Sequence, residues 1–116
     1  MQNVKIWHNP RCSKSRAAAA LLEEKGVEAE VVKYLDNPPT NEELKILLSQ
    51  LGMSARELMR TKEDIYNELD LENEIDEEKL IEAMVENPKL IERPIVIKDG
   101  KAVIGRPIEN IVELLK

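Results

Sequence analysis

The spacing of apolar residues predicts the order of strands and helices along the chain. In residues 4–7 apolar and polar positions alternate, and Asn9-Pro10 follows, which is typical of a strand ending in a turn. Residues 12–26 begin with small and polar side chains, continue with alanine and leucine, and end at a glycine, which predicts a helix. Residues 28–35 predict a second strand. Because a helix connects the two strands, we expect them to pair in parallel with a right-handed crossover.

The middle of the chain has helical periodicity. The first two segments each place a glutamate three residues after a hydroxyl side chain, which is the capping-box pattern of a helix start. Leucines then recur at helical spacing, and the last segment ends before Pro88. Four helical segments are therefore predicted, opening at Thr40, Ser54, Thr61 and Asp76.

The end of the chain returns to strands. Two apolar runs flank Asp99-Gly100, a strong hairpin signal, and a last helix is predicted to start at Pro107. The order is strand–helix–strand, a helical insert at about 40–88, then strand–strand–helix. This order predicts a single α/β domain over residues 1–116 with a thioredoxin-like fold: a four-stranded mixed sheet that carries the insert between its halves.

Composition narrows the class of protein. A chain of 116 residues that is 42% hydrophobic can bury a core by itself. The N-terminus lacks the apolar stretch of a signal peptide, and no apolar run reaches the roughly 18 residues needed to span a bilayer. We therefore expect a cytoplasmic monomer with no membrane partner. The net charge of −6 also argues against a nucleic-acid partner.

Positive charge is concentrated at one end of the chain. Residues 1–22 hold four basic and no acidic side chains, whereas the remaining residues hold 13 basic and 23 acidic ones. The basic residues surround Cys12, the only cysteine of the chain. This clustering indicates an anion site at the start of the first predicted helix.

A lone cysteine constrains the chemistry. It forms no internal disulfide, so a redox reaction must take its second thiol from another molecule, and a cysteine-rich metal site is excluded. The thiolate is the reactive form, and a thiol pKa near 8.5 leaves only a few per cent of it at pH 7. Lowering that pKa by about two units requires roughly 2.7 kcal/mol. A helix N-terminus supplies about 0.3 to 1 kcal/mol, whereas a cation at about 4 Å supplies about 4 kcal/mol at an effective dielectric of about 20.

Nearby cations are therefore predicted to carry most of the shift. The candidates closest in the chain are His8 and Arg16, and Ser15 offers a hydroxyl donor to the sulfur. An attacking thiolate and an oxyanion repel each other, so further cations are needed to bind both. Arg93 and Arg106 each precede a proline, which favours an extended arginine, and Arg-Pro before a strand is typical of the cis-proline beside the cysteine in thioredoxin-like folds.

Five motifs in this order closely resemble the glutaredoxin-coupled arsenate reductase (ArsC) family over Val4 to Leu115: HNPRCSKSR, YLDNPPTNEEL, ARELMRTKE, NPKLIERPIVI and GRP. The resemblance implies that Cys12 is the nucleophile, supported by His8, Ser15 and Arg16. It also implies that three arginines surround the oxyanion: Arg60, Arg93 and Arg106. Arg60 is identified by its motif alone, because composition does not distinguish it from Arg56.

The resemblance further implies an oxidoreductase of arsenic detoxification. Arsenate forms an adduct with Cys12, glutathione acts as the thiol co-substrate, glutaredoxin is the electron donor, and no metal or bound cofactor is expected. The length is most similar to the chromosomal branch of the family. Arg11, Ser13 and Lys14 differ from the plasmid-type loop and add two positive charges, which leaves the oxyanion preference open.

Two alternatives without arsenate turnover share parts of this pattern. Spx-type transcription regulators have the same fold but typically carry Cys-x-x-Cys, whereas here Ser15 occupies the second position. A monothiol glutaredoxin would match Cys-x-x-Ser but would leave the three arginines without a purpose. The low-molecular-weight phosphatase type of arsenate reductase is excluded, because it needs Cys-x5-Arg and residue 18 is alanine.

Overall fold

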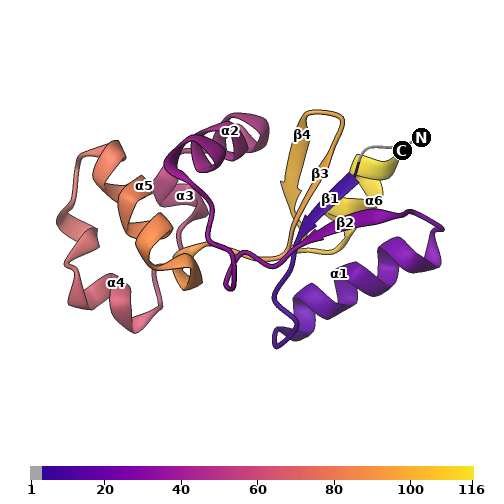
Figure 1. Cartoon of the computed structure of the whole chain (residues 1–116), viewed down its shortest axis with the longest axis horizontal. Coiled ribbons are helices and arrows are strands. Elements are labelled where there is room, and N and C mark those ends of the chain that lie inside the picture. The colour runs from indigo at the N-terminus through magenta and orange to yellow at the C-terminus, as the bar shows by residue number, and fades with distance from the viewer. Residues whose placement is uncertain (1–3) are drawn as a thin grey trace. The chain divides into compact units, whose positions relative to one another are not determined.

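A computed structural model describes residues 4–116, and its residues group into two compact units (Figure 1). The sheet unit is formed by the chain up to Asn37 and from Arg93 onward, and the helical unit comprises Pro38–Glu92. The helical insert is therefore a few residues longer at each end than the predicted 40–88.

The sheet unit contains four strands: β1 (Val4–Trp7), β2 (Ala29–Val32), β3 (Ile95–Lys98) and β4 (Lys101–Ile104). Their spatial order is β2-β1-β3-β4. β1 pairs in parallel with β2 and antiparallel with β3, and β3 pairs antiparallel with β4. The predicted four-stranded mixed sheet, with its parallel pair and its hairpin, is confirmed.

One face of this sheet packs against two helices, α1 (Ser13–Glu24) and α6 (Glu109–Leu115). The side chains of a strand alternate between faces, so β1 places Val4 and Ile6 on the helical face and Trp7 on the other. The buried cluster on the helical face is Val4, Ile6, Ala18, Leu22, Val96 and Ile111. Trp7 stacks on buried Tyr34, with ring centroids 5.9 Å apart. α1 is thus fixed on the sheet along its length, and its N-terminus lies just beyond the end of β1.

Three predicted boundaries differ from the structure for local reasons. β2 is shorter than the predicted 28–35, because the N–H groups of Asp36 and Asn37 both donate to the carbonyl of Lys33 and close a turn. α6 begins at Glu109 rather than Pro107. Its first hydrogen bonds span only three residues, so the entry is a tight turn and not yet an α-helix. The third is the segment predicted to open at Thr61, which becomes α-helical only at Asp64. The periodicity also did not predict two short 3-10 helices: η1 (Leu71–Asn73) and η2 (Pro88–Leu90).

The hairpin between β3 and β4 turns through Asp99 and Gly100. Their φ angles are 50° and 83°, the two positive values that a two-residue type I′ turn requires. Asp99 tolerates this conformation and glycine adopts it freely, so the Asp-Gly prediction is confirmed.

The helical unit contains α2 (Asn41–Leu51), α3 (Ala55–Leu58), α4 (Asp64–Glu68) and α5 (Glu77–Glu86), and both predicted capping boxes are present. α2 and α3 pack on α5 through buried leucine, isoleucine and methionine side chains. Each fully buried side chain of this type contributes about 1.5 to 3 kcal/mol, so the unit has a core of its own. Among the helices between residues 4 and 116, none is long and apolar enough to cross a membrane.

A short antiparallel contact lies within the helical unit, between the residue that follows α3 and the residue that follows η2. Met59 and Ile91 form an isolated β-bridge. On either side of it, Arg60 N–H donates to the Leu90 carbonyl at 2.6 Å and Glu92 N–H donates to the Leu58 carbonyl at 3.0 Å. The backbone at Arg60 is therefore fixed by hydrogen bonds.

The two units differ sharply in charge. The sheet unit holds 11 basic and 8 acidic residues, a net of +3, and the helical unit holds 6 basic and 15 acidic residues, a net of −9. The acidity of the chain therefore belongs to the helical unit, and Cys12 lies in the unit with the positive balance. This division favours anion binding near the thiol.

Candidate active site

Cys12 caps the N-terminus of α1 and lies in a loop that its own hydrogen bonds hold in place. Cys12 N–H donates to the Asn9 carbonyl at 3.0 Å, and Arg11 N–H donates to Asn9 Oδ1 at 3.0 Å. Asn9 N–H in turn donates to Ser15 Oγ at 2.9 Å. Asn9 and Ser15 are both buried, so these bonds are shielded from water. The loop from His8 to Cys12 is thus tied to the first turn of the helix.

The pKa of the Cys12 thiol lies below its ordinary value. Burial of Cys12, a residue that is only 9% exposed, raises the pKa. Hydrogen bonds from Ser15 N–H, the Arg93 side chain and Lys14 N–H lower it, as does the charge of Arg93, and together they outweigh the burial. The folded protein therefore stabilises the thiolate, which is the nucleophilic form.

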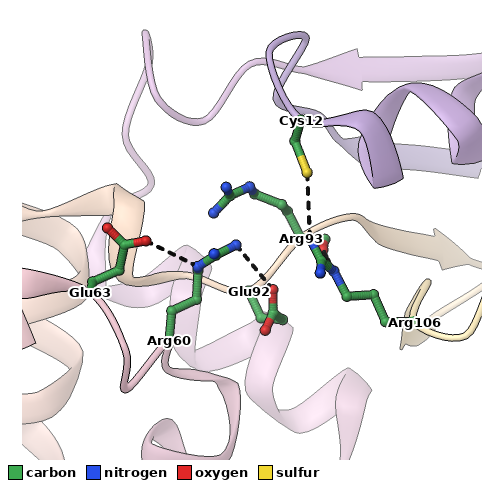
Figure 2. A network of polar contacts seen from close by, with 6 residues as sticks. All are labelled: Cys12, Arg60, Glu63, Glu92, Arg93 and Arg106. Carbon is green, nitrogen blue, oxygen red and sulfur yellow. Dashed lines mark hydrogen bonds and ion pairs between the residues drawn. The ribbon is translucent and has the colours of Figure 1, made fainter.

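The two Arg-Pro arginines both reach Cys12. Arg106 Nη2 lies 3.4 Å from the Cys12 sulfur, and Arg106 Nε donates to the Arg93 carbonyl at 2.7 Å (Figure 2). Arg93 donates to the same sulfur. Segments that are far apart in the sequence thus bring two guanidinium groups to one thiol. Both Arg-Pro peptide bonds are cis.

Gly105 allows the two Arg-Pro segments to approach each other. A Cβ at this position would lie 2.8 Å from Ile111 Cδ1 and 2.9 Å from Pro94 Cγ, both closer than carbon atoms pack. Gly105 N–H donates to the Pro94 carbonyl at 2.8 Å. The glycine that precedes Arg106 is therefore required by close packing, and it fixes the backbone from which Arg106 reaches the sulfur.

His8 lies next to the site but is not the cation that we expected. Its Nδ1 forms a 2.7 Å hydrogen bond with Ser15 Oγ. Burial lowers the pKa of His8, the charge of Lys33 lowers it further, and a hydrogen bond with Ser15 raises it less. The imidazole is therefore neutral at pH 7, and its contact with Ser15 orients the loop rather than attracting an anion.

We predict that His8 titrates below the ordinary histidine pKa of about 6.5. A proton NMR titration measures this directly, because the chain has one histidine and its ring resonances need no assignment by mutation. A His8 pKa above 7 would contradict the neutral assignment and restore His8 as a cation beside the thiolate.

Ser15 and Arg16 contact the site differently from the predicted arrangement. The Ser15 hydroxyl is engaged by His8 and Asn9, and it is the backbone N–H of Ser15 that helps to lower the pKa of the Cys12 thiol. Arg16 is exposed, and its guanidinium forms no hydrogen bond or ion pair within residues 4–116. Its N–H donates to the Cys12 carbonyl at 3.0 Å as part of the helix. Proximity in the chain therefore did not identify the cation that contacts the sulfur.

Arg60 belongs to the helical unit and is bound by two carboxylates. Its Nε lies 3.4 Å from Glu63 Oε2 and its Nη1 lies 3.4 Å from Glu92 Oε1. Arg56 has a different environment, because its guanidinium donates to Tyr66 Oη at 2.6 Å and to the carbonyls of Leu71 and Glu74. Arg56 thus stabilises the loop before α5, which is a structural role. The spacing of residues in the sequence does not distinguish this role from that of Arg60. Within the described residues, no group of three or more histidine, cysteine or acidic side chains could hold a metal ion.

We predict that iodoacetamide alkylates Cys12 with a pH midpoint below about 8.5. Because the thiolate is favoured in the folded state, it also contributes to the free energy of unfolding. That contribution is fully present above about pH 8.5 and is lost as the pH falls through the lower pKa of the folded protein. Stopped-flow alkylation across pH 5 to 9 measures the pH midpoint of the reaction, and urea unfolding over the same range measures the contribution to the free energy of unfolding. A midpoint at or above that of a free thiol would contradict the assignment.

Comparisons with known proteins identify one family. The sequence profile of the ArsC family matches residues 7–114. A protein named arsenate reductase from Neisseria meningitidis serogroup A is 56% identical over 99% of this chain and 100% of its own length. The uncharacterized protein YfgD of Escherichia coli K12 is 60% identical over 98% of both chains. A solved arsenate reductase structure from Vibrio cholerae has a TM-score of 0.94 and 50% identity, and the match covers 97% of each chain.

Proposed function

Because this chain belongs to the ArsC family, we propose that it is an arsenate reductase in which the Cys12 thiolate is the nucleophile. The observation that carries the proposal is the meeting of two guanidinium groups, those of Arg93 and Arg106, at the sulfur of a cysteine on a helix N-terminus. A monothiol glutaredoxin needs neither arginine at this position. A thiol that attacks an oxyanion needs both to offset the repulsion between the two anions.

The first step forms a sulfur–arsenic bond. The thiolate attacks As(V) of arsenate and an arsenate oxygen leaves as water, which gives a covalent Cys12–arsenate adduct. Arg93 and Arg106 hydrogen-bond to the arsenate oxygens and offset the negative charge that develops on them. The N–H groups of Lys14 and Ser15, which help to lower the pKa of the Cys12 thiol, favour an anion at the same helix end.

External thiols then supply two electrons. Glutathione replaces a further oxygen on arsenic, again with loss of water. The glutaredoxin thiol attacks the glutathione sulfur, forms a mixed disulfide and leaves an electron pair on arsenic, which becomes As(III). Water releases arsenite and regenerates Cys12. This sequence is consistent with a chain that has one cysteine and therefore no internal resolving thiol.

We include Arg60 among the residues that bind the oxyanion, because its position in the Leu-Met-Arg segment matches the family pattern. His8, Ser15 and Arg16 are proposed as supporting residues. The described geometry supports His8 and Ser15 as groups that hold the loop around Cys12. For Arg16 it supports only a contribution to the positive field near the thiol.

The test of the proposed function is arsenite release from arsenate by the purified protein, supplied with glutathione and glutaredoxin. Release that requires both thiols and is lost in Cys12→Ser supports the whole scheme. Release that proceeds with thioredoxin in place of glutaredoxin would correct the donor. A wild-type protein that releases no arsenite with any thiol donor would overturn the function.

A further inference from the structure

Arg106 extends from the short loop that joins β4 to α6 in the sheet unit. β4 ends at Ile104 and α6 begins at Glu109. From this loop, Arg106 Nη2 reaches the Cys12 sulfur at 3.4 Å (Figure 2). An arginine side chain has several rotatable bonds and loses rotamer freedom when its head group is fixed. The position of the Arg106 guanidinium therefore depends on how firmly the loop holds its backbone.

The side-chain amide of Asn110, in the first turn of α6, binds this loop. Its Nδ2 donates to the Ile104 carbonyl at 3.0 Å and to the Arg106 carbonyl at 3.4 Å. Both partners are main-chain oxygens, which accept hydrogen bonds and do not donate them. The group that faces them is therefore the NH2 end of the amide, whose two hydrogens serve both carbonyls. These carbonyls lie on either side of Gly105, so one amide fixes the backbone before and after the glycine.

The loop is thus attached to the sheet unit on two sides. On one side, Arg106 Nε donates to the Arg93 carbonyl at 2.7 Å. On the other side, Asn110 attaches the loop to α6, and the residue after Asn110, Ile111, is completely buried in the core between helix and sheet. The first contact orients the Arg106 side chain, and the second fixes the backbone that carries it.

We propose that Asn110 is a positioning residue, which fixes the Arg106 backbone so that the guanidinium is in place for an oxyanion at Cys12. The inference rests on the proposed function, because it gives Asn110 a purpose in binding the same oxyanion. An arginine on a free loop would lose conformational freedom when it binds arsenate, and a loop that is already fixed removes part of that cost.

The experiment measures steady-state arsenate reduction for Asn110→Ala and Asn110→Asp, each in the wild-type and Arg106→Ala backgrounds. Asn110→Ala is expected to lower kcat/KM for arsenate about tenfold, because a displaced guanidinium stabilises the developing charge less well. Asn110→Asp has the same size but no donor for the two carbonyls, so it should be at least as impaired as Asn110→Ala. Glu109→Ala, at the exposed neighbouring position of α6, is the matched control and should keep the wild-type kcat/KM.

A third variant and a stability measurement separate positioning from loss of the fold. Asn110→Ser places a hydroxyl four residues after Arg106, where serine donates to the carbonyl of a preceding helical turn, so its kcat/KM should lie between those of wild type and Asn110→Ala. The urea midpoint of Asn110→Ala should stay close to that of the wild type, because alanine is a better helix former than asparagine. A kcat/KM loss that follows the urea midpoint across these variants would overturn the proposal.

The Arg106→Ala background shows whether Asn110 acts through Arg106. Once Arg106 is absent, Asn110→Ala should change kcat/KM by less than about twofold. An equal loss in both backgrounds would overturn the proposal. An Asn110→Asp variant as active as the wild type would overturn it as well, and so would an Asn110→Ala variant with wild-type kcat/KM.

A measurement without turnover distinguishes this inference from the proposed function. Arsenate is added to slow the alkylation of Cys12 by iodoacetamide, and Asn110→Ala should raise the half-protecting arsenate concentration in the wild-type background but not in the Arg106→Ala background. If the wild-type protein reduces no arsenate but arsenate still protects Cys12, the proposed function fails, and the order of the variants still decides the role of Asn110. If arsenate neither reacts nor protects, both proposals are overturned.

Discussion

Replacement of Cys12 by serine is expected to lower arsenite release by at least about a thousandfold. The two side chains are similar in size, so the loop and the N-terminus of α1 should keep their conformation. The hydroxyl, however, stays protonated at neutral pH, and the hydrogen bonds that stabilise a thiolate do not ionise it. The loss should therefore appear in kcat, and the folded state should be unaffected.

The measurement combines arsenite release with urea unfolding and alkylation. Cys12→Ser should unfold at nearly the wild-type urea concentration and take up no iodoacetamide, since it has no other cysteine. Ser13→Ala, an exposed neighbour in the first turn of α1, is the control and should retain activity. A serine variant with more than about a tenth of the wild-type rate would show that Cys12 does not form the adduct.

Loss of either Arg-Pro arginine is the second large expected effect. Arg93→Ala and Arg106→Ala should each lower kcat/KM by about 100- to 1000-fold, which corresponds to about 2.7 to 4 kcal/mol for one lost donor to a developing oxyanion. Each removes a guanidinium that contacts the Cys12 sulfur. Arg93→Ala should also raise the pKa of Cys12, because the charge and the hydrogen bond of Arg93 both lower it.

Two further arginines test the specificity of this result. Arg11→Ala should reduce kcat/KM only slightly, because Arg11 is exposed and only its backbone N–H takes part in the loop. Arg16→Ala should shift the Cys12 pKa less than Arg93→Ala does. Lysine at position 93 or 106 should recover part of the activity, since it keeps the charge but not the guanidinium fork. Equal losses at Arg11, Arg16, Arg93 and Arg106 would contradict the site assignment.

Much of this fold is determined by interactions between neighbouring residues, and these elements could be predicted from the sequence. The capping boxes at Thr40 and Ser54 and the Asp99-Gly100 turn depend on neighbouring residues only, so their patterns predict them directly. The placement of Cys12 at a helix N-terminus follows from the strand–helix order. The boundaries of β2 and α6 depend on turns whose hydrogen bonds have no comparable sequence pattern, and there the predictions were wrong by several residues.

The contacts of the candidate site were harder to predict from the sequence, because they depend on tertiary structure. Arg16 is four residues from Cys12 and exposed, whereas Arg106 is 94 residues away and contacts the sulfur. The charge state of His8 depends on burial and on Lys33, which a linear motif does not encode. Composition does not distinguish Arg56 from Arg60, and the family motif alone selects Arg60; the different partners of the two arginines become visible only in the folded helical unit.

The anchor of Arg106 is a main-chain carbonyl, that of Arg93, and not its side chain. Any residue at position 93 that keeps the backbone path supplies the same acceptor. Substitution of the Arg93 side chain therefore leaves this acceptor for Arg106 in place, so the loss expected for Arg93→Ala comes from the missing guanidinium of Arg93 and not from a displaced Arg106.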